Sequence, residues 1–406
     1  MIMAGGMVII GGGMAGARGV ITLRGHGYGG PVTLLSDEAI LPYDRPPLSK
    51  SAITEEAEPA PIQLLDDGIV ASLKADVRLG CAIQRIDRST KDVVLADGNR
   101  VAYDKLLIAT GAKPRKLGGP GGEHALTLRD FADAKILRRS FQREAKVVII
   151  GGGFIGLELA ASSSKRGCRV TLVEAQPRIL MRGVPEAIAR IVHDRHTTAG
   201  VEIITGTAIA ALRRDAVELA DGRILPADVI IAGIGAAPET RLAAEAGLAL
   251  DNGVACDQHM RTSDPDIYAS GDCCSFIHES YGRRIRLEAW RSAQEQAATA
   301  TENMLGGTKI HNAIPWFWSD QHDLSLQIAG IADAGPETVV RKSANDTMIM
   351  FHLASDGAIK GASGIGVGNA IARDIKLSEM MIAKGMKPAR EALADPQQQL
   401  KSLLKA

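Results

Sequence analysis

A glycine-rich segment occurs twice in this chain of 406 residues and constrains the fold more than any other feature. The first copy is MVIIGGGMAGARGV at residues 7–20, and the second is KVVIIGGGFIGLEL at residues 146–159. In each, an apolar run predicts a buried strand, G-x-G-x-x-G follows, and the next residues predict a helix. The loop glycines are Gly11, Gly13 and Gly16 in the first copy and Gly151, Gly153 and Gly156 in the second.

Such a loop is suited to the pyrophosphate of a dinucleotide. The first glycine makes the tight turn, the second lets the pyrophosphate approach the backbone, and the third lets the helix pack on the strand. The phosphates then meet free N–H groups at a helix N-terminus, where the macrodipole favours negative charge. Either copy alone is compatible with an ordinary glycine-rich turn. Two copies in the same context favour two dinucleotide sites.

An acid about 20 residues beyond the loop is expected to bind the ribose hydroxyls. In the second copy this acid is Glu174, which closes the apolar stretch VTLVE. A carboxylate there binds the 2′-OH and repels a 2′-phosphate, so NADH is favoured over NADPH. In the first copy Ser36 stands at the matching position, and we assign the role to the next residue, Asp37.

The chemistry of the two sites favours different cofactors. Two nicotinamide cofactors would exchange a hydride without net chemistry. FAD beside NADH pairs a two-electron donor with a carrier that releases electrons singly. The repeated loop therefore predicts FAD on the first copy and NADH on the second.

Length and composition bound the class of protein. A chain of this length is expected to form two or three domains. Lys plus Arg and Asp plus Glu are both 47, so the formal charge is zero and nothing indicates nucleic acid. No apolar run approaches the roughly 20 residues that span a bilayer. The opening MIMAGGMVII lacks the basic start and cleavage site of a signal peptide, and we predict a cytoplasmic protein.

Strands and helices alternate along most of the chain, which predicts an α/β fold with two Rossmann-like dinucleotide-binding domains. Glycine- and proline-rich linkers follow residues 111 and 235, and the pattern changes again at IPWFWSD, residues 314–320. We therefore predict a discontinuous FAD domain (1–111 and 236–313), an NADH domain (112–235) and a C-terminal α+β domain (314–406). Within the NADH domain we expect a helix near 185–199 and a strand over 208–219.

Several motifs then carry a resemblance to a known family. IATG (108–111), GIG (233–235) and YASGD (268–272) occur with the two loops in the order seen in two-dinucleotide-fold flavoprotein reductases of the glutathione-reductase-like fold. YDRPPLSK (43–50) and PWFWSDQ (315–321) narrow the resemblance to FAD-dependent ferredoxin reductases of oxygenase systems, the putidaredoxin reductase and biphenyl dioxygenase ferredoxin reductase family. The similarity covers essentially the whole chain.

The resemblance implies an NADH-dependent oxidoreductase, a flavoprotein, that passes single electrons to a small [2Fe-2S] ferredoxin. That ferredoxin would feed a Rieske oxygenase or a cytochrome P450, as in a dioxygenase system of aromatic hydrocarbon catabolism. The chain is expected to act as a monomer or homodimer, with no nucleic acid and no membrane as partner.

The resemblance also implies which residues contact the cofactors. For FAD, beside the first loop, they are Ala15, Asp37, Lys50, Ile83, Ala109, Thr110, Gly111, Arg129, Gly271, Asp272 and Trp290. For NADH, beside the second loop, they are Ile155, Glu158, Glu174 and Arg182. Met14, Arg45, Gly235, Glu288 and Trp318 complete the predicted set.

Three of these residues are predicted to be catalytic: Lys50, Glu158 and Trp318. Hydride transfer from nicotinamide C4 to flavin N5 requires positioning and electrostatics rather than a general acid or base. Lys50 would stabilise the reduced anionic flavin, with Glu158 as its carboxylate partner, and Trp318 would lie over the flavin. The alternatives are a solvated loop lysine for Lys50 and hydrophobic packing at a domain junction for Trp318.

The sequence favours no metal site. HDRH (193–196) has two histidines at helical spacing but no third ligand, and we interpret it as an exposed helix face. Cys273 and Cys274 could form a vicinal disulfide, but two free thiols at a strand-to-helix junction are favoured. The chain lacks the paired cysteines of a disulfide reductase, and the iron–sulfur cluster is expected on the partner protein.

Other interpretations remain open at this stage. A reductase of the same kind could use rubredoxin, a quinone or monodehydroascorbate as acceptor. An NADH-sensing interaction flavoprotein, like apoptosis-inducing factor, is a different class. Three basic clusters are candidates for docking an acidic ferredoxin: Arg138–Arg139, Arg283–Arg284–Arg286 and Lys384–Lys387–Arg390.

Overall fold

The fold is described on a computed structural model, which describes residues 5–343 and 347–404. The start of the opening segment, residues 1–4, lies outside that part. The chain divides into two compact units. Unit 1 comprises Met1–Asp44, Pro61–Lys113 and Ala237–Ala313, and unit 2 comprises Arg45–Ala60, Pro114–Ala236 and Ile314–Ala406.

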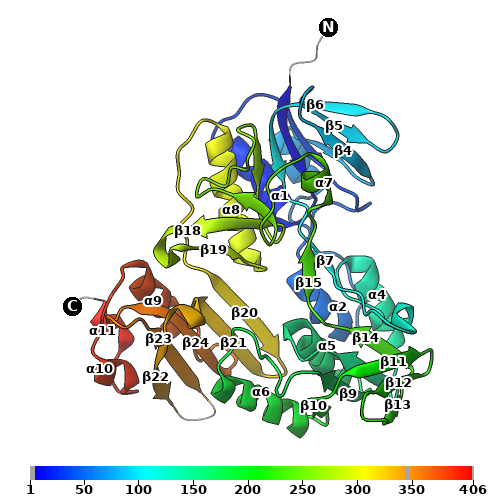
Figure 1. Cartoon of the computed structure of the whole chain (residues 1–406), viewed down its shortest axis with the longest axis vertical. Helices are drawn as coiled ribbons and strands as arrows, with labels where there is room; N and C mark the ends of the chain where they lie inside the picture. The colour runs from blue at the N-terminus through cyan, green and yellow to red at the C-terminus, as the bar shows by residue number, and fades with distance from the viewer. Residues whose placement is uncertain (1–4, 344–346, 405–406) are drawn as a thin grey trace. The chain divides into compact units, whose positions relative to one another are not determined.

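Unit 1 is built around a mixed sheet (Figure 1). The strands of unit 1 are β1 (Gly6–Ile10), β2 (Val32–Leu35), β3 (Asp76–Arg78), β4 (Ile83–Asp87), β5 (Asp92–Leu95), β6 (Arg100–Ile108), β16 (Val254–Cys256), β17 (Ile267–Ala269), β18 (Cys274–His278) and β19 (Arg283–Arg286). Its helices are α1 (Met14–Gly25), α3 (Asp67–Leu73), α7 (Arg241–Glu245) and α8 (Trp290–Met304). The short strands β7 (Ala112–Pro114) and β15 (Ala236–Pro238) fall where the chain passes from one unit to the other.

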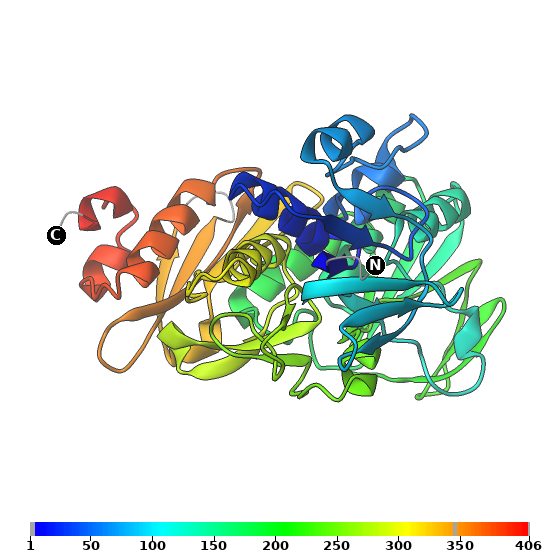
Figure 2. The ribbon, with the colours of Figure 1, turned by 90° about the horizontal axis from the view of Figure 1, so that it is seen from above.

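The main sheet of unit 1 has the order β3-β2-β1-β6-β5-β4, and β17 also pairs with β6. β1 lies between two parallel neighbours, β2 and β6, and all of its residues are buried. Such burial on both faces explains why these strands are continuous apolar runs. Helices α1 and α8, far apart in the sequence, pack against each other, as Figures 1 and 2 show.

Unit 2 contains a parallel sheet, a small antiparallel sheet and a larger antiparallel sheet. Their strands are β8 (Lys146–Ile150), β9 (Arg169–Glu174), β10 (Glu202–Thr205) and β14 (Val229–Ala232); β11 (Ile209–Arg213), β12 (Ala216–Leu219) and β13 (Ile224–Pro226); and β20 (Trp316–Gln321), β21 (Leu324–Gly330), β22 (Glu337–Lys342), β23 (Met348–Leu353) and β24 (Ile359–Val367). The helices of unit 2 are α2 (Ser51–Thr54), α4 (Phe131–Ser140), α5 (Phe154–Lys165), α6 (Glu186–Thr198), α9 (Ala372–Ala383), α10 (Arg390–Ala394) and α11 (Leu400–Leu403). The described residues of both units also form four 3₁₀ turns: η1 (Pro46–Ser49), η2 (Gly122–His124), η3 (Glu279–Tyr281, in unit 1) and η4 (Ala332–Ala334).

Helix α5 joins the parallel sheet of unit 2 to the C-terminal sheet. One hydrophobic core contains Leu157 of α5, Ile149 of β8, and Leu326 of β21. Ile53, from the short helix α2, belongs to the same core. A helix surrounded in this way is made of small and apolar residues on all sides, as FIGLELAASSSK is. The predicted NADH domain and the predicted C-terminal domain lie together in unit 2, so the division of the chain into three domains stays a prediction.

Some predicted elements differ from the structure. Residues 208–219, predicted as one strand, form the antiparallel pair β11 and β12, because the chain reverses at Arg214–Asp215. Helices α3 and α4 lie in segments that the sequence pattern left without structure. Cys273 and Cys274 are free thiols, as favoured, but Cys273 immediately precedes β18 and Cys274 begins it, so a strand rather than a helix follows them. Burial raises the pKa of Cys273 to about 11, so its reactive thiolate form is disfavoured.

A search of the described helices finds none whose length and apolar content would suffice to span a bilayer.

Three buried histidines predict how stability depends on pH. Burial lowers the pKa of His196, His311 and His352 from 6.5 to about 4. The unfolded chain therefore binds more protons than the folded chain between about pH 6.5 and 4. We expect the free energy of unfolding to fall as pH is lowered through this window, by on the order of 3 kcal/mol for each histidine.

Urea denaturation at pH 7, 5.5 and 4.5 measures this dependence. The variant His352→Leu removes one of the three groups, so its stability should fall less steeply with decreasing pH than that of the wild type. Equal slopes for the two proteins would contradict the assignment.

Candidate cofactor sites

The first glycine loop has the geometry that a bound pyrophosphate requires. Gly11 has φ 116°, and its N–H donates to the carbonyl of Leu35 at 2.8 Å. A Cβ at Gly16 would overlap the carbonyl oxygen of Gly11, so only glycine lets α1 come this close to the strand. Helix α1 has Gly13 as its N-cap, with no side chain over its first N–H groups.

The second loop repeats this geometry. Gly151 has φ 109°, and its N–H donates to the carbonyl of Val173 at 2.8 Å. A Cβ at Gly156 would overlap the carbonyl oxygen of Gly151, and Gly153 caps α5. The two loops are therefore equivalent in backbone conformation and in close contacts. This supports the prediction of two pyrophosphate sites.

The equivalence extends to the strands beside the loops. The N–H of Ala109, after β6, donates to Ile10 at 2.8 Å, and that of Gly233, after β14, donates to Ile150 at 2.7 Å. Two residues further on, Gly111 has φ 70° and Gly235 has φ 97°. The ATG and GIG motifs therefore occupy the same position in two copies of one fold. Thr110 is fixed there by a hydrogen bond of 2.7 Å from its hydroxyl to the carbonyl of Glu239.

The acid predicted for NADH is held against its loop. Glu174 ends β9, and its Oε2 accepts from the N–H of Gly152 at 2.7 Å. Its Oε1 accepts from the N–H of Gln176 at 2.8 Å. Two backbone donors thus keep the carboxylate at the loop, where a ribose would lie.

The first copy has no equivalent carboxylate at that position. Ser36 is buried beside Gly12, at the position that Glu174 occupies beside Gly152. Asp37, the predicted ligand, is exposed. Glu38 accepts a hydrogen bond of 2.7 Å from the hydroxyl of Tyr43. The role of Asp37 stays a prediction.

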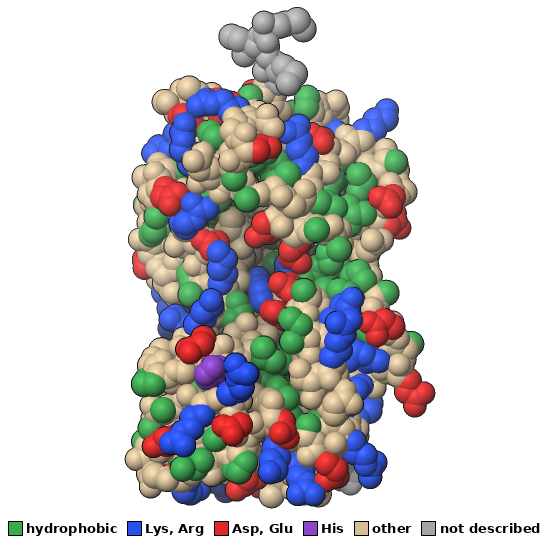
Figure 3. Space-filling view, turned by 90° about the vertical axis from the view of Figure 1, so that its right-hand side faces the viewer, with side chains coloured by type: hydrophobic (Ala, Val, Ile, Leu, Met, Phe, Trp, Pro, Cys, Tyr) green, Lys and Arg blue, Asp and Glu red, His purple; other side chains and the backbone are tan. Residues whose placement is uncertain are grey.

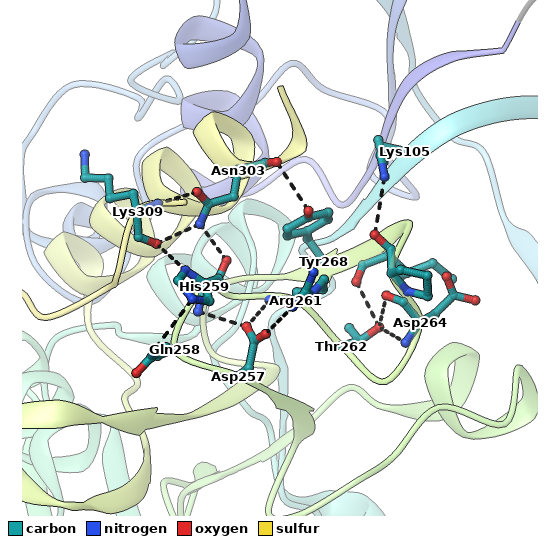
Figure 4. A network of polar contacts seen from close by, with 12 residues as sticks. Lys105, Asp257, Gln258, His259, Arg261, Thr262, Asp264, Tyr268, Asn303 and Lys309 are labelled. Atoms are coloured by element: carbon teal, nitrogen blue, oxygen red, sulfur yellow. Dashed lines mark hydrogen bonds and ion pairs between the residues drawn. The ribbon is translucent and has the colours of Figure 1, made fainter. Parts of the chain in front are cut away.

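The YASGD segment is fixed by helix α8. Gly271 has φ 80°, and its N–H donates to the side chain of buried Gln296 at 2.8 Å. Figure 4 shows the polar network that holds the preceding strand. There the hydroxyl of Tyr268 donates to the carbonyl of Asn303, and the Asn303 amide donates to the carbonyls of His259 and Lys309. Hydrogen bonds to residues of α8 therefore hold both the middle of this strand and Gly271, which follows it.

Trp290, predicted to contact FAD, is the first residue of α8. Its indole N–H donates to Oδ1 of Asp44 at 2.6 Å. Burial raises the pKa of Asp44, and this hydrogen bond lowers it in part. The contact ties the start of α8 to the YDRPPLSK motif, of which Asp44 is the second residue.

The other predicted FAD contacts lie in both units. In unit 1, the sulfur of Met14 accepts a hydrogen bond from Gln294, and Ala15 lies beside Gly271. The carbonyl of Ile83 accepts a hydrogen bond from Arg241. Glu288 is exposed and forms an ion pair of 2.6 Å with Arg286. In unit 2, the guanidinium of Arg45 donates to the carbonyl of Arg129 at 2.8 Å. Their contacts with cofactor stay predictions.

Two further predicted NADH contacts lie on the open side of the second loop. Ile155, in the first turn of α5, is 44% exposed although it is apolar. Arg182 is exposed, and its guanidinium comes within 3.4 Å of the Cβ position of Gly235. An exposed apolar side chain and an exposed guanidinium fit a ligand with both an aromatic ring and phosphates.

Lys50 and Glu158 form an ion pair inside unit 2. The Nζ of Lys50 lies 2.7 Å from Oε2 of Glu158, which is 5% exposed. The hydroxyl of Ser49 also donates to Oε2, and that of Ser319 donates to Oε1 at 2.6 Å. A buried carboxylate requires such partners because its desolvation is costly. The expected pairing is present, and it does not fit the alternative of a solvated loop lysine.

Ser49 and Ser319 are partners of Glu158 that the sequence alone does not reveal. Their separation from it, 109 and 161 residues, leaves no local pattern that joins them. Each lies inside a motif that carried the family resemblance, YDRPPLSK and PWFWSDQ.

Trp318 lies on β20, next in sequence to Ser319, the hydrogen-bond partner of Glu158. It stacks on Trp316 with ring centroids 5.1 Å apart, and Phe317 contacts Phe154 of α5 at 4.4 Å. These contacts fit the alternative of hydrophobic packing and leave a role at the flavin as a prediction.

The interpretation of HDRH as an exposed helix face is wrong for His196. This residue is fully buried, because the turn between β20 and β21 packs over α6. Its two ring nitrogens contact Gln321 and His322. Within residues 5–343 and 347–404, no three His, Cys, Asp or Glu side chains form a metal-binding group.

Comparisons with known proteins cover the whole length of the chain. The family model described as pyridine nucleotide-disulphide oxidoreductase matches residues 6–297, and that described as reductase C-terminal matches residues 316–404. The anthranilate 1,2-dioxygenase system ferredoxin–NAD(+) reductase component of Burkholderia cepacia is 37% identical over 404 residues, 98% of each chain. A rubredoxin-NAD(+) reductase of Pseudomonas putida is 39% identical over 331 residues, 80% of this chain and 86% of that protein.

A solved structure gives the same result for the fold. The crystal structure of the covalent putidaredoxin reductase–putidaredoxin complex matches with a TM-score of 0.94. The match has 33% sequence identity and covers 99% of this chain and 98% of that chain.

The third glycine of each loop offers a test of the two sites. In Gly156→Ala the new Cβ would force α5 away from Gly151, so we expect NADH to bind at least about tenfold more weakly. Gly16→Ala should lower the FAD content of the purified protein in the same way. Calorimetric titration with NADH and the flavin absorbance per chain measure the two effects.

Gly25→Ala is the matched control, because this glycine of α1 has open space around its Cβ position. It should leave both values unchanged. Undiminished NADH affinity in Gly156→Ala would show that the second loop does not hold the dinucleotide.

Proposed function

Because the chain belongs to the pyridine nucleotide-disulphide oxidoreductase family, we propose that it is an NADH-dependent ferredoxin reductase with FAD as its cofactor. The matches confirm the predicted family, fold class and enzyme class. The observation that carries the function is the pair of equivalent glycine loops, together with the Lys50–Glu158 ion pair, in a chain that matches ferredoxin reductases from end to end.

The first loop would hold the pyrophosphate of FAD in unit 1. Gly13 leaves the N-terminus of α1 open, and Gly11 and Gly16 allow the backbone to come close. Asp272 follows Gly271, whose N–H is fixed by Gln296, so its position is set before any ligand binds. FAD supplies the chemistry that the protein lacks, accepting two electrons and releasing them singly.

The second loop would hold NADH. Glu174 supplies a carboxylate for the ribose hydroxyls, and its two backbone donors fix its position. Ile155 and Arg182 lie exposed beside the loop, where they can contact the ring and the phosphates.

Lys50 would stabilise the negative charge that the flavin gains on reduction. Its side chain is 26% exposed, so the ammonium remains accessible on one side, while Glu158 holds it from the other. A preorganised cation in a partly dry site stabilises developing charge more strongly than one in water. No proton transfer by a side chain is needed for the hydride step itself.

The proposed electron acceptor is a small [2Fe-2S] ferredoxin of an oxygenase system. The solved relative is a reductase in covalent complex with putidaredoxin, and the Burkholderia relative is a reductase component of a dioxygenase system. A rubredoxin is the second candidate, favoured by the relative from Pseudomonas putida. Cytoplasmic location and a monomeric or dimeric state stay predictions.

The three basic clusters differ in their suitability as a docking surface. Arg138 donates to the four backbone carbonyls of Ile53, Glu55, Glu56 and Ala57 and therefore has a structural role. Arg284 likewise donates to the carbonyls of Cys256 and Ser275. Lys387 and Arg390 form ion pairs with Asp356 and Glu337 but remain exposed. On the face seen in Figure 3, basic and acidic side chains are interspersed.

Rapid mixing of the FAD-loaded protein with NADH tests the proposed function. We expect the oxidised flavin absorbance to disappear within one turnover, and the reduced flavin to be reoxidised by a purified [2Fe-2S] ferredoxin much faster than by rubredoxin or a quinone. Reoxidation that is slow and independent of ferredoxin would refute the proposal.

Lys50→Ala tests the ion pair in the same experiment. We expect the rate constant of flavin reduction by NADH to fall at least about tenfold, because one preorganised charge is lost. Lys376→Ala is the control, because it removes an exposed lysine that pairs with Glu379 on α9 and should have no effect. A wild-type rate in Lys50→Ala would remove Lys50 from the mechanism.

Glu174→Gln tests the preference for NADH. The amide oxygen can still accept from a backbone donor, but the negative charge that repels a 2′-phosphate is gone. The ratio of kcat/KM for NADH to that for NADPH should therefore fall by about tenfold. Glu202→Gln, on the neighbouring strand β10, should leave the ratio unchanged.

A further inference from the structure

A chain of hydrogen bonds leads from Glu158 through unit 2 to the turn between β20 and β21. Oε1 of Glu158 contacts the hydroxyl of Ser319 at 2.6 Å, and that hydroxyl contacts Nε2 of Gln321 at 3.0 Å. Oε1 of Gln321 lies 3.1 Å from Nε2 of His196. Nδ1 of His196 lies 3.2 Å from Nε2 of His322. Apart from Glu158, these hydrogen-bonded residues have no role in the function proposed above.

Only one arrangement of protons satisfies every bond. An ionised carboxylate can only accept, so Ser319 donates to Glu158 and its oxygen accepts from the amide N–H of Gln321. The amide oxygen of Gln321 then faces His196, which must carry its proton on Nε2. Nδ1 of His196 accepts from His322. Each donor in the chain therefore points toward Glu158.

The environment of His196 agrees with this assignment. Burial, opposed by the hydrogen bond to Gln321 and helped by neighbouring His322 and His193, lowers its pKa to about 4, so the ring is neutral with a single N–H. His322 is half-buried, and its charged neighbours Asp323 and Arg195 form an ion pair with each other. His193 lies 3.5 Å from Asp194.

The chain depends on His196 because its central members are buried. Ser319, Gln321 and His196 are exposed by 3% or less. Without His196, the oxygen of Gln321 would lose its partner, and a buried polar atom without a partner is costly. The amide would then no longer be fixed with its N–H group toward Ser319, and the orientation of the Ser319 hydroxyl toward Glu158 would lose its support.

We propose that His196 is a positioning residue of this reductase: through Gln321 and Ser319 it keeps the carboxylate of Glu158 oriented toward Lys50. The inference rests on the role of Lys50 in the proposed function. The chain orients the carboxylate and does not conduct protons, because a proton could cross Gln321 only through the imidic acid form of its amide.

Four variants of the FAD-loaded protein test this role by stopped-flow reduction with saturating NADH. His196→Leu and Ser319→Ala should each lower the rate constant by about tenfold, since each removes the same hydrogen bond to a charge. The double variant should be no slower than either single variant, because His196 acts through Ser319. His196→Gln keeps a donor at the position of Nε2 and should stay within about twofold of wild type.

His352→Leu is the matched control. His352 is also buried in unit 2 with its pKa lowered to about 4, but its bond of 2.9 Å ends at Ser363. This variant should reduce its flavin at the wild-type rate. The flavin midpoint potential should shift in His196→Leu and Ser319→Ala and remain at the wild-type value in His352→Leu.

Three results would overturn the inference: a wild-type rate in His196→Leu, additive losses in the double variant, or no rescue by His196→Gln. If His196→Leu does not fold, Gln321→Met cuts the chain at the next link and should give the same loss, and a wild-type rate there would also overturn it. Lys50→Ala separates this inference from the proposed function. If Lys50→Ala is slow while His196→Leu is not, only the role of His196 is wrong; if both keep the wild-type rate, the role of the ion pair is wrong as well.

Discussion

The close approach of a helix to a strand at each glycine loop determines the rest of the structure. Gly16 and Gly156 lie so near the carbonyls of Gly11 and Gly151 that any side chain would separate the two elements. This contact sets the direction of α1 and α5 and leaves their first N–H groups uncovered. The motifs at the ends of β6 and β14 then meet the loops in the same register in both copies. The chain therefore uses the same local structure at both predicted dinucleotide sites.

The second copy has an additional feature that the first lacks. Helix α5 is buried from Gly156 to Ser163 and carries a carboxylate, Glu158, beside the core that it shares with the C-terminal sheet. The enclosure makes the carboxylate sensitive to every donor around it, since water cannot replace a missing partner. Ser49, Lys50 and Ser319 come from two distant segments to meet that requirement. A helix that begins at a predicted phosphate site therefore also organises a charged site one turn further along.

The sequence predicted the fold class, the two loops and the acid at Glu174, because these depend on local patterns of strand, glycine and helix. The resemblance supplied Lys50 and its partner Glu158, which no spacing could have joined. Local patterns failed where long-range packing decides. His196 was interpreted as exposed because its helix is polar on that face, and only the β20–β21 turn buries it. Helix α4 was missed because a glycine- and proline-rich linker precedes it.

The position of Ser319 has a consequence for how such proteins can be recombined. The first strand of the C-terminal sheet completes the surroundings of a residue on the nucleotide-binding helix. A chimera that takes its last ninety or so residues from a relative inherits a new partner for Glu158, even though the crossover lies far from both glycine loops. Exchange of the C-terminal region between family members therefore also changes the surroundings of the Lys50–Glu158 ion pair, and compatibility has to be judged at β20 rather than at the linker.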